Sequence, residues 1–120
     1  MLADSNIIIY ASKPDGDKAR NFIRRHSPAI SVISQVEVLG YHKLDPIERQ
    51  MLEQFFQASL ILPISNDVVD EAIRLRQMRK MSLGDSIVAA TAIVRNLTPA
   101  THNINDFSWI TGLALIDPMI

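Results

Sequence analysis

The chain has 120 residues, with 12 lysines and arginines against 13 aspartates and glutamates, and a net charge of −1. This length and a hydrophobic content of 48% predict a single packed domain over residues 1–120. The near-neutral charge argues against a protein that coats nucleic acid without specificity. The absence of cysteine excludes disulfides, zinc–thiolate sites and thiol nucleophiles. With no long apolar run and no signal-like start, we expect a soluble, cytoplasmic protein without a membrane segment.

The first segment has two interpretations. Three consecutive isoleucines within Asn6–Tyr10 favour a strand, because β-branched side chains are stiff and suit a sheet. The alternative places the strand at Met1–Ala3 and starts a helix afterwards, capped by Ser5 or Asn6. The residues alone do not decide between the two.

Helical and β-type segments alternate through the rest of the chain. A helix is predicted over Gly16–His26, and a β-branched run predicts a strand over Ala29–Ile33. Asp45 followed by Pro46 marks the start of a helix. The remaining predicted elements are the end of that helix near Ser59, a strand at Leu60–Ile64, helices at Asn66–Lys80 and Ser86–Asn96, and short strands at Thr98–Thr101 and Leu113–Ile116. This alternation predicts an α/β/α sandwich with a central, mainly parallel sheet.

Four acidic residues are not fully explained by solvated helix faces. Glu37 interrupts an apolar stretch, although it also fits the wet side of an amphipathic helix. Asp4 follows an apolar start and is equally suited to capping a helix. Asp85 precedes the most apolar helix and completes a capping box with Ser82. Asp106 is suited to capping a short helical turn.

Taken together, these four acids indicate a metal site. Ligands of parallel α/β sheets bind beyond the carboxyl ends of the strands, and each of the four follows a predicted strand or begins a helix. Converging carboxylates repel one another unless a cation neutralises them, and all-oxygen ligands suit Mg²⁺ or Mn²⁺. Such a site supports metal-assisted hydrolysis of phosphodiesters.

At this point the motifs resemble a known family. Asp4-Ser5-Asn6, Glu37, the segment Gly84–Ala92 and the segment Thr101–Phe107, in this order, resemble the PIN domain and in particular the VapC-type ribonuclease toxins of toxin–antitoxin pairs. The resemblance extends over the whole chain and implies a PIN-like α/β/α sandwich. It also implies that the stretch after the first acid, Asn6–Ala11, is helical despite its strand propensity.

The resemblance implies a role for each acid. Asp4 and Asp85 are expected to be the principal ligands of Mg²⁺ or Mn²⁺, with Glu37 as a further site acid. The fourth acid is found either where this chain has Asn103 or at the position of Asp106, and we favour Asp106. Asn103, Thr101 and Asn6 are expected to support the site. The implied activity is endoribonucleolytic hydrolysis of RNA, with Glu37 and Asp106 holding the attacking water.

The expected partners are an RNA substrate, a cognate antitoxin and a second copy of the chain. A basic group, Arg74, Arg76, Arg79 and Lys80, is the candidate RNA-binding surface, with a solvated helix face as the alternative. The first two helices and the apolar set Leu52, Phe55 and Phe56 are candidates for antitoxin or dimer contact, with core packing as the alternative. A catalytically weakened binding module is the rival function. A phosphoacceptor receiver domain is disfavoured because the acids are spread over the whole chain.

Overall fold

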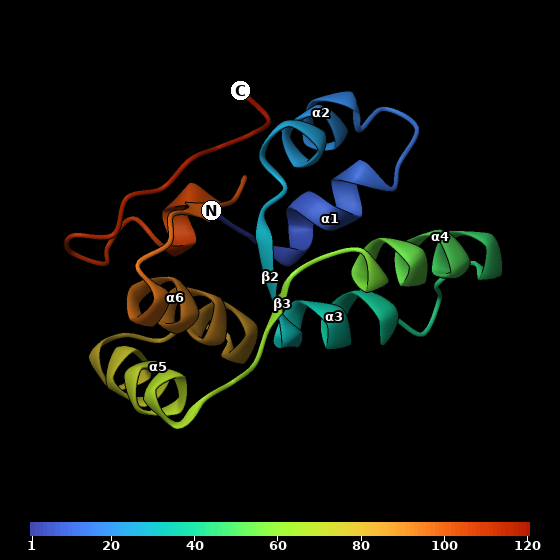
Figure 1. Ribbon diagram of the computed structural model, residues 1–120. Helices are drawn as coiled ribbons and strands as arrows, with labels where there is room; N and C mark the ends of the chain where they lie inside the picture. Colours follow the sequence, from blue (N-terminus) through green and yellow to red (C-terminus); the bar gives the residue numbers. More distant parts are fainter.

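A parallel four-stranded sheet lies at the centre of the molecule. The computed structural model describes all residues 1–120 (Figure 1). The strand order in the sheet is β3-β2-β1-β4. The strands are short: β1 (Leu2–Ala3), β2 (Ala29–Ser31), β3 (Ile61–Leu62) and β4 (Pro99–Ala100).

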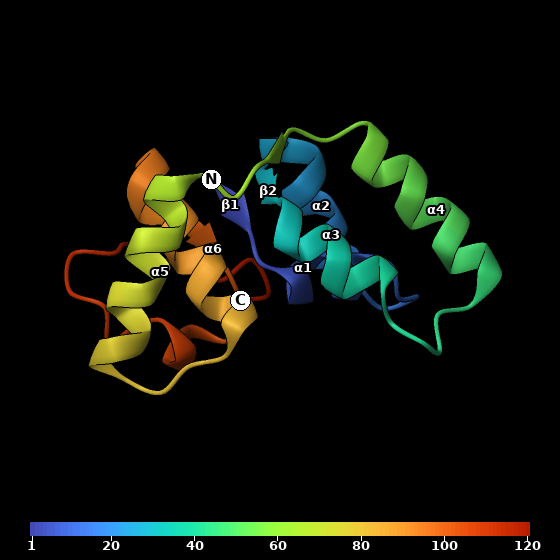
Figure 2. The ribbon, with the colours of Figure 1, turned by 90° about the horizontal axis from the view of Figure 1, so that it is seen from below.

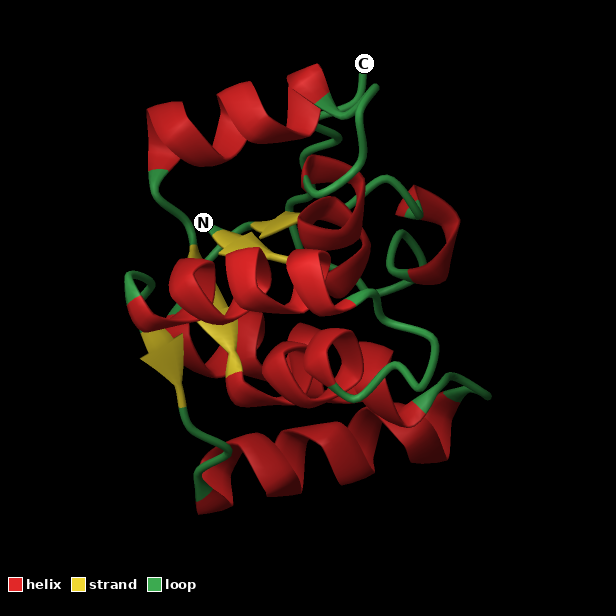
Figure 3. Ribbon diagram, turned by 90° about the vertical axis from the view of Figure 1, so that its right-hand side faces the viewer, coloured by secondary structure: helices red, strands yellow, loops and turns green.

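Helices make up most of the fold, as Figure 3 shows. They are α1 (Ser5–Ala11), α2 (Asp17–His26), α3 (Val32–Leu39), α4 (Pro46–Gln57), α5 (Asn66–Met78), α6 (Leu83–Arg95) and the short 3-10 helix η1 (Ile104–Asp106). Because the strands are only two or three residues long, burial of helix faces contributes more to cohesion than ladder hydrogen bonds do. None of the helices has both the length and the hydrophobicity that a membrane crossing requires.

Each face of the sheet carries its own hydrophobic core. Leu2 and Ala29 belong to a cluster of 13 buried residues that is built mainly from α5 and α6. Ile30 belongs to a second cluster with residues of α1, α3 and α4. Neighbouring residues of a strand point to opposite faces, so Ala29 and Ile30 serve different cores. Figure 2 shows the sheet between α5–α6 on one side and α1–α4 on the other, which confirms the predicted α/β/α sandwich.

Polar caps fix where the strands change into helices. The carboxylate of Asp4 accepts a hydrogen bond from the Ser5 backbone N–H and caps α1, so the isoleucine run is helical. The Ser31 hydroxyl accepts from the Ile33 N–H at 3.2 Å and caps α3. The strand predicted over Ala29–Ile33 therefore ends at Ser31, and its last two residues are helical.

Other boundaries also differ from the prediction, and β3 and β4 are each shorter than the predicted strands. The helix predicted to start at Ser86 begins at Leu83, because the Ser82 hydroxyl caps it by accepting from the Asp85 N–H at 3.1 Å. The predicted strand Leu113–Ile116 is reduced to a single bridge between Ile116 and Ala100. Ile116 lies at the edge of the sheet beyond β4, where no further strand completes a ladder.

Candidate functional site

Asp4 lies where β1 changes directly into α1. Its residue exposure is only 4%, yet its carboxylate is well supplied with donors. The Ser5 backbone N–H donates to Oδ1 at 2.7 Å, and the Thr101 hydroxyl, just beyond β4, donates to Oδ2 at 2.9 Å. Two adjacent strand ends therefore hold one buried carboxylate at the carboxyl edge of the sheet.

Glu37 reaches the same edge from the middle of α3. The Ser5 hydroxyl donates to its Oε1 at 2.7 Å, and the buried Ser34 Oγ lies 2.9 Å from the Ser5 oxygen. A close approach of α6 also positions this carboxylate. A Cβ added to Gly84 would lie 2.8 Å from Cδ of Glu37 and 2.9 Å from its Oε1, so glycine leaves the space that the carboxylate occupies.

Asp85 and Asp106 complete the acidic group from the other side. Asp85 is half-buried in the first turn of α6, and Asp106 is exposed at the end of η1. The negative charges of Asp106 and Glu37 both act on Asp85, and those of Asp85 and Glu37 act on Asp4. All four predicted acids therefore gather at one edge of the sheet, with Asp85 coupled to each of the others.

This crowding changes the ionisation of the two most buried acids. Burial raises the pKa of Asp4 to about 6, and the charges of Asp85 and Glu37 act in the same direction. Hydrogen bonds from Thr101 and Ser5 oppose this rise in the pKa. Burial also raises the pKa of Asp85, with the charges of Asp106 and Glu37 adding to it and the Ser82 hydrogen bond opposing it. A perturbed acid pair of this kind marks a functional-site candidate.

Comparison with known proteins identifies the architecture around these acids. The family model of the PIN domain matches residues 1–110. The chain belongs to the PIN-domain family. It is 31% identical to a chain of a toxin–antitoxin complex from Klebsiella pneumoniae, with 98% of this chain and 96% of that chain covered and a TM-score of 0.80.

Two other solved structures share the fold of this PIN domain. VapBC2 from Rickettsia felis, bound to a DNA fragment from its promoter, matches with a TM-score of 0.83 at 24% identity, covering 97% of this chain and 96% of that chain. DNA-bound VapBC from Salmonella typhimurium matches with a TM-score of 0.84 at 20% identity, covering 98% and 96%. No curated protein sequence matches significantly. The predicted resemblance to VapC-type PIN domains is confirmed at the level of the family.

The donor set of this PIN domain suits a hard divalent cation. Every polar side-chain group at the edge offers oxygen, and the mutual repulsion of the acids is the kind that a bound cation relieves. In their present rotamers, no three His, Asp or Glu side chains converge closely enough to enclose an ion. Asp106 is exposed on a single 3-10 turn, so rotation of its side chain can tighten the group without moving the backbone.

The predicted supporting residues are in different situations. Thr101 donates to Asp4 and accepts from the backbone N–H of Asn103 at 3.0 Å, so it fixes both the acid and the chain that leads to η1. Asn103 contributes through this backbone bond, and no hydrogen bond of its side-chain amide is present. Asn6 is half-buried on α1, beside the capping residue Asp4.

The predicted basic surface divides into two parts. Arg74 forms an ion pair with Glu71 on α5. Arg76, Arg79 and Lys80 are exposed and form no ion pair. Arg79 follows the last residue of α5, and its guanidinium lies over the Trp109 ring, 5.6 Å from the ring centroid.

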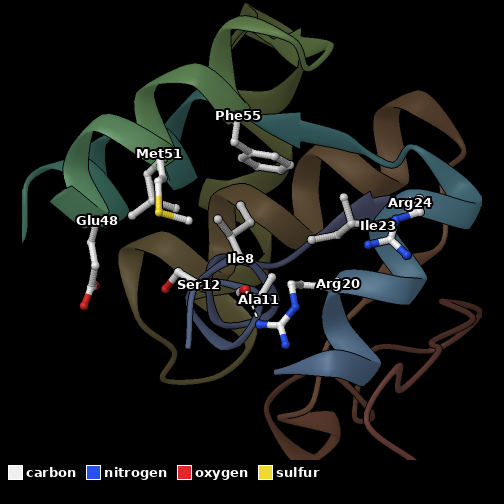
Figure 4. Close-up of a pocket in the computed structure, with 10 residues that line it drawn as sticks. Ile8, Ala11, Ser12, Arg20, Ile23, Arg24, Glu48, Met51 and Phe55 are labelled. Carbon is white, nitrogen blue, oxygen red and sulfur yellow. Dashed lines mark hydrogen bonds between the residues drawn. The ribbon is translucent and has the colours of Figure 1, made fainter. Parts of the chain in front are cut away.

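An apolar groove runs between α1, α2 and α4, with a volume of about 280 Å³. Figure 4 shows Ile8, Met51 and Phe55 facing it, with Arg24 at its α2 edge and Glu48 at its α4 edge. Of the three apolar residues predicted to contact a partner, Phe55 lines this groove. Leu52 also lines it but is buried, and the buried Phe56 belongs to the core, as the alternative interpretation predicted.

The prediction that Ser5 or Asn6 caps the first helix was wrong, because Asp4 is the cap and Ser5 is the first helical residue. Sequence reasoning also missed Ser34 and the contact of Ser5 with Glu37, and it treated Gly84 only as part of a motif. Ser34 is fully buried in α3, and a serine within an otherwise apolar stretch is the signal that could have indicated it. The contact from Ser5 to Glu37 spans 32 residues, and no local pattern encodes it.

Proposed function

We propose that this PIN domain is a Mg²⁺- or Mn²⁺-dependent endoribonuclease that acts as the toxin of a toxin–antitoxin pair. The observation that carries the proposal is the gathering of Asp4, Glu37, Asp85 and Asp106 at the carboxyl edge of the sheet. The 31% identity to a chain of a toxin–antitoxin complex supports the biological role. The absence of a cysteine and of a suitable serine–histidine pair favours water as the nucleophile.

Asp4 and Asp85 are the residues that would hold the cation, since they are the least exposed of the four acids. A bound divalent cation supplies charge neutralisation at the scissile phosphate and lowers the pKa of an attacking water. Glu37, held by Ser5, and Asp106, on η1, would accept hydrogen bonds from that water and orient it. Thr101 keeps Asp4 in place through its hydroxyl.

Cleavage of a labelled single-stranded RNA with Mn²⁺ tests the assignment. Asp4→Asn and Asp85→Asn are each expected to lower the cleavage rate by at least about 100-fold, because each removes a charge that the transition state requires. The matched control is Asp70→Asn, an exposed acid on α5, which is expected to retain wild-type activity. Undiminished cleavage by both site variants would overturn the assignment.

A binding module with a weakened metal site is the second candidate function. It is favoured by the observation that no three acidic side chains enclose an ion in their present rotamers. Calorimetric titration with Mn²⁺ separates the candidates. The nuclease binds the ion with an affinity that Asp4→Asn abolishes, whereas the binding module shows no uptake and no RNA cleavage.

We further propose that the groove between α1, α2 and α4 receives an apolar helix of the antitoxin. Its floor is apolar, and the basic Arg24 and the acidic Glu48 at opposite edges would orient an incoming helix by charge. Arg20 also lines the groove, but it is occupied with the carbonyl groups of Ala11 and Lys13 and with Asp17. Arg24 is therefore the guanidinium available to a partner.

Co-purification with the proposed antitoxin, sought as the product of a small open reading frame beside the gene, tests the groove. Met51→Glu places a charge on the apolar floor and is expected to abolish the complex. Ile47→Glu is the control, because Ile47 is 72% exposed on the same helix and does not line the groove. Equal loss of the complex in both variants, or in neither, would contradict the assignment.

We also propose that the chain forms a homodimer through the exposed apolar face of α5 and the start of α6. Val69, Ile73 and Leu83 are exposed apolar residues around a second groove of about 680 Å³ between α5 and α6. Sedimentation of the wild type and of Ile73→Glu measures the oligomeric state. A wild-type dimer that Ile73→Glu converts to a monomer places the interface here, and a monomeric wild type refutes the proposal.

A further inference from the structure

The guanidinium of Arg79, near the acidic edge, contacts the ring of Trp109 and no carboxylate. Arg79 follows α5, where the backbone turns to an extended conformation with φ −160° and ψ 149°. This turn directs the chain out of the helix, and the Arg79 guanidinium lies 5.6 Å from the centre of the Trp109 ring. A cation–π contact with an indole ring uses no N–H donor of the guanidinium, so these N–H groups stay free to donate to a ligand.

Trp109 ties this cation to the acidic group. Its indole N–H donates to the backbone carbonyl of Asp106 at 3.0 Å, while its ring packs against the larger hydrophobic core. Arg79 is also connected to the site through the backbone, because it lies three residues before Ser82, which caps the helix that carries Asp85. Both partners of the contact therefore lie close in the chain to a site acid, Arg79 six residues before Asp85 and Trp109 three residues after Asp106.

Arg79 has no acid to neutralise it. The ion pairs of the molecule join other residues, including Arg74 with Glu71 on the same helix, and no carboxylate lies within 4.0 Å of Arg79. An exposed cation–π contact is worth little to stability, so the pair is weakly explained as a structural element. An ordered, unpaired guanidinium next to a hydrolytic site instead suits a bidentate contact with a phosphate group.

On these grounds we propose that Arg79, positioned by Trp109, binds a backbone phosphate of single-stranded RNA next to the phosphate that is cut. The inference rests on the proposed nuclease function, because it takes the strand to lie across the acidic edge. The RNA phosphate supplies the counter-charge that Arg79 lacks, and the fixed ring reduces the side-chain entropy lost when the strand binds. Trp109 is a positioning residue that acts through Arg79.

Binding is measured separately from cleavage. In an Asp4→Asn background with EDTA, so that no divalent cation competes for the phosphates, the anisotropy of a fluorescein-labelled single-stranded RNA gives the affinity as a function of salt. Arg79→Gln is expected to weaken binding about two- to fivefold and to lower the slope of log K against log salt by about 0.7, the loss of one phosphate contact. Arg95→Gln, at the last residue of α6 and so at the opposite end of that helix from Asp85, is the control that leaves the slope unchanged.

A double-mutant cycle tests the role of Trp109. Trp109→Leu is expected to weaken binding, and the combination with Arg79→Gln is expected to be no weaker than Arg79→Gln alone, because Trp109 acts only through Arg79. Trp109→Phe retains a ring and is expected to retain most of the affinity. Trp109 is the only tryptophan, so a change in its emission on adding RNA, absent in Arg79→Gln, reports the same contact directly.

The salt slope and the double-mutant cycle decide whether Arg79 contacts a phosphate. An unchanged salt slope in Arg79→Gln, or losses that simply multiply in the double variant, would overturn it and leave Arg79 and Trp109 as a structural pair. Absence of RNA binding by the parent protein would overturn it too. If the slope falls as expected but the wild type cuts no RNA, the phosphate contact stands and the proposed nuclease function fails.

Discussion

Replacing Asp4 by asparagine is expected to stabilise the metal-free protein while it abolishes the metal response. The pKa of Asp4 is about 6 in the folded protein, against 3.8 for an unperturbed aspartate, so ionising it in the native state costs about 3 kcal/mol at 1.36 kcal/mol per pKa unit. The introduced amide removes this cost. It also disturbs one of the two hydrogen bonds from Ser5 and Thr101, and this loss lowers the free energy of unfolding by about 1 kcal/mol. We therefore expect a net gain of about 1–3 kcal/mol at pH 7.

The stability difference between Asp4→Asn and the wild type is expected to change with pH. Because the folded pKa lies above the unfolded one, the native state retains a proton between about pH 4 and pH 6 that the unfolded chain has released. The stability of the wild type therefore falls as the pH rises through this window. The advantage of Asp4→Asn should be largest above pH 6 and should shrink towards pH 4.

Thermal unfolding with EDTA, measured from pH 4 to pH 8, checks this expectation. A domain of this size gains roughly 3–6 °C in Tm per kcal/mol, so the difference at pH 7 is readily resolved. Asp15→Asn, at an exposed acid in the turn after α1, is the control and should show no such trend. The reasoning is refuted if Asp4→Asn is no more stable than the wild type at pH 7, or if its advantage is the same at pH 4 and pH 7.

Three further predictions concern the same edge of the sheet. Gly84→Ala should lower RNA cleavage about 100-fold, because the added Cβ would lie 2.8 Å from Cδ of Glu37, closer than the 3.4 Å of ordinary contact, and would displace that carboxylate. Its Tm should be equal or slightly higher, because alanine favours a helix. Wild-type cleavage by this variant would show that Glu37 need not stay near Ser5. Thr101→Val should weaken Mn²⁺ binding about 10- to 100-fold in calorimetry by removing the donor to Asp4, and an unchanged affinity would contradict this role. For the wild type, Mn²⁺ affinity should fall about tenfold per pH unit below pH 6, as the cation competes with the proton on Asp4, and a flat profile from pH 5 to pH 7 would argue against Asp4 as a ligand.

The sequence predicted well those features that are local. Two helix starts have a short-range cause that the sequence shows, Asp45 before Pro46 and Ser82 before Asp85, and both caps are present. The helix α3 was not predicted, because the β-branched run that leads into it favours a strand. The isoleucine run was ambiguous because its strand propensity competes with the cap that Asp4 provides, and only the family resemblance favoured the helix that the structure contains. Burial of Ile7 and Ile8 against the sheet then outweighs their propensity.

The features that could not be predicted depend on contacts between distant segments. The gathering of the acids at one edge was predictable, because ligands of parallel sheets bind beyond the carboxyl ends of the strands. The Ser5 hydroxyl that holds Glu37 was not predictable, because it comes from α1 and depends on the packing of α3 against α1. The steric role of Gly84 depends likewise on the distance between α6 and α3. Leu113–Ile116 has strand propensity, but propensity does not show whether a neighbouring strand is available to pair with it.

The direct passage from β1 into α1 and from β2 into α3, without a loop at either junction, divides the acidic edge into parts of different mobility. Asp4 and the helix that carries Glu37 cannot shift without unwinding a capped first turn. Asp106, by contrast, lies on a single exposed 3-10 turn. Hydrogen–deuterium exchange should therefore be slower along α1 and α3 than around η1. Asp106 would therefore adjust to substrates of different shape, while Asp4 and Glu37 stay in place.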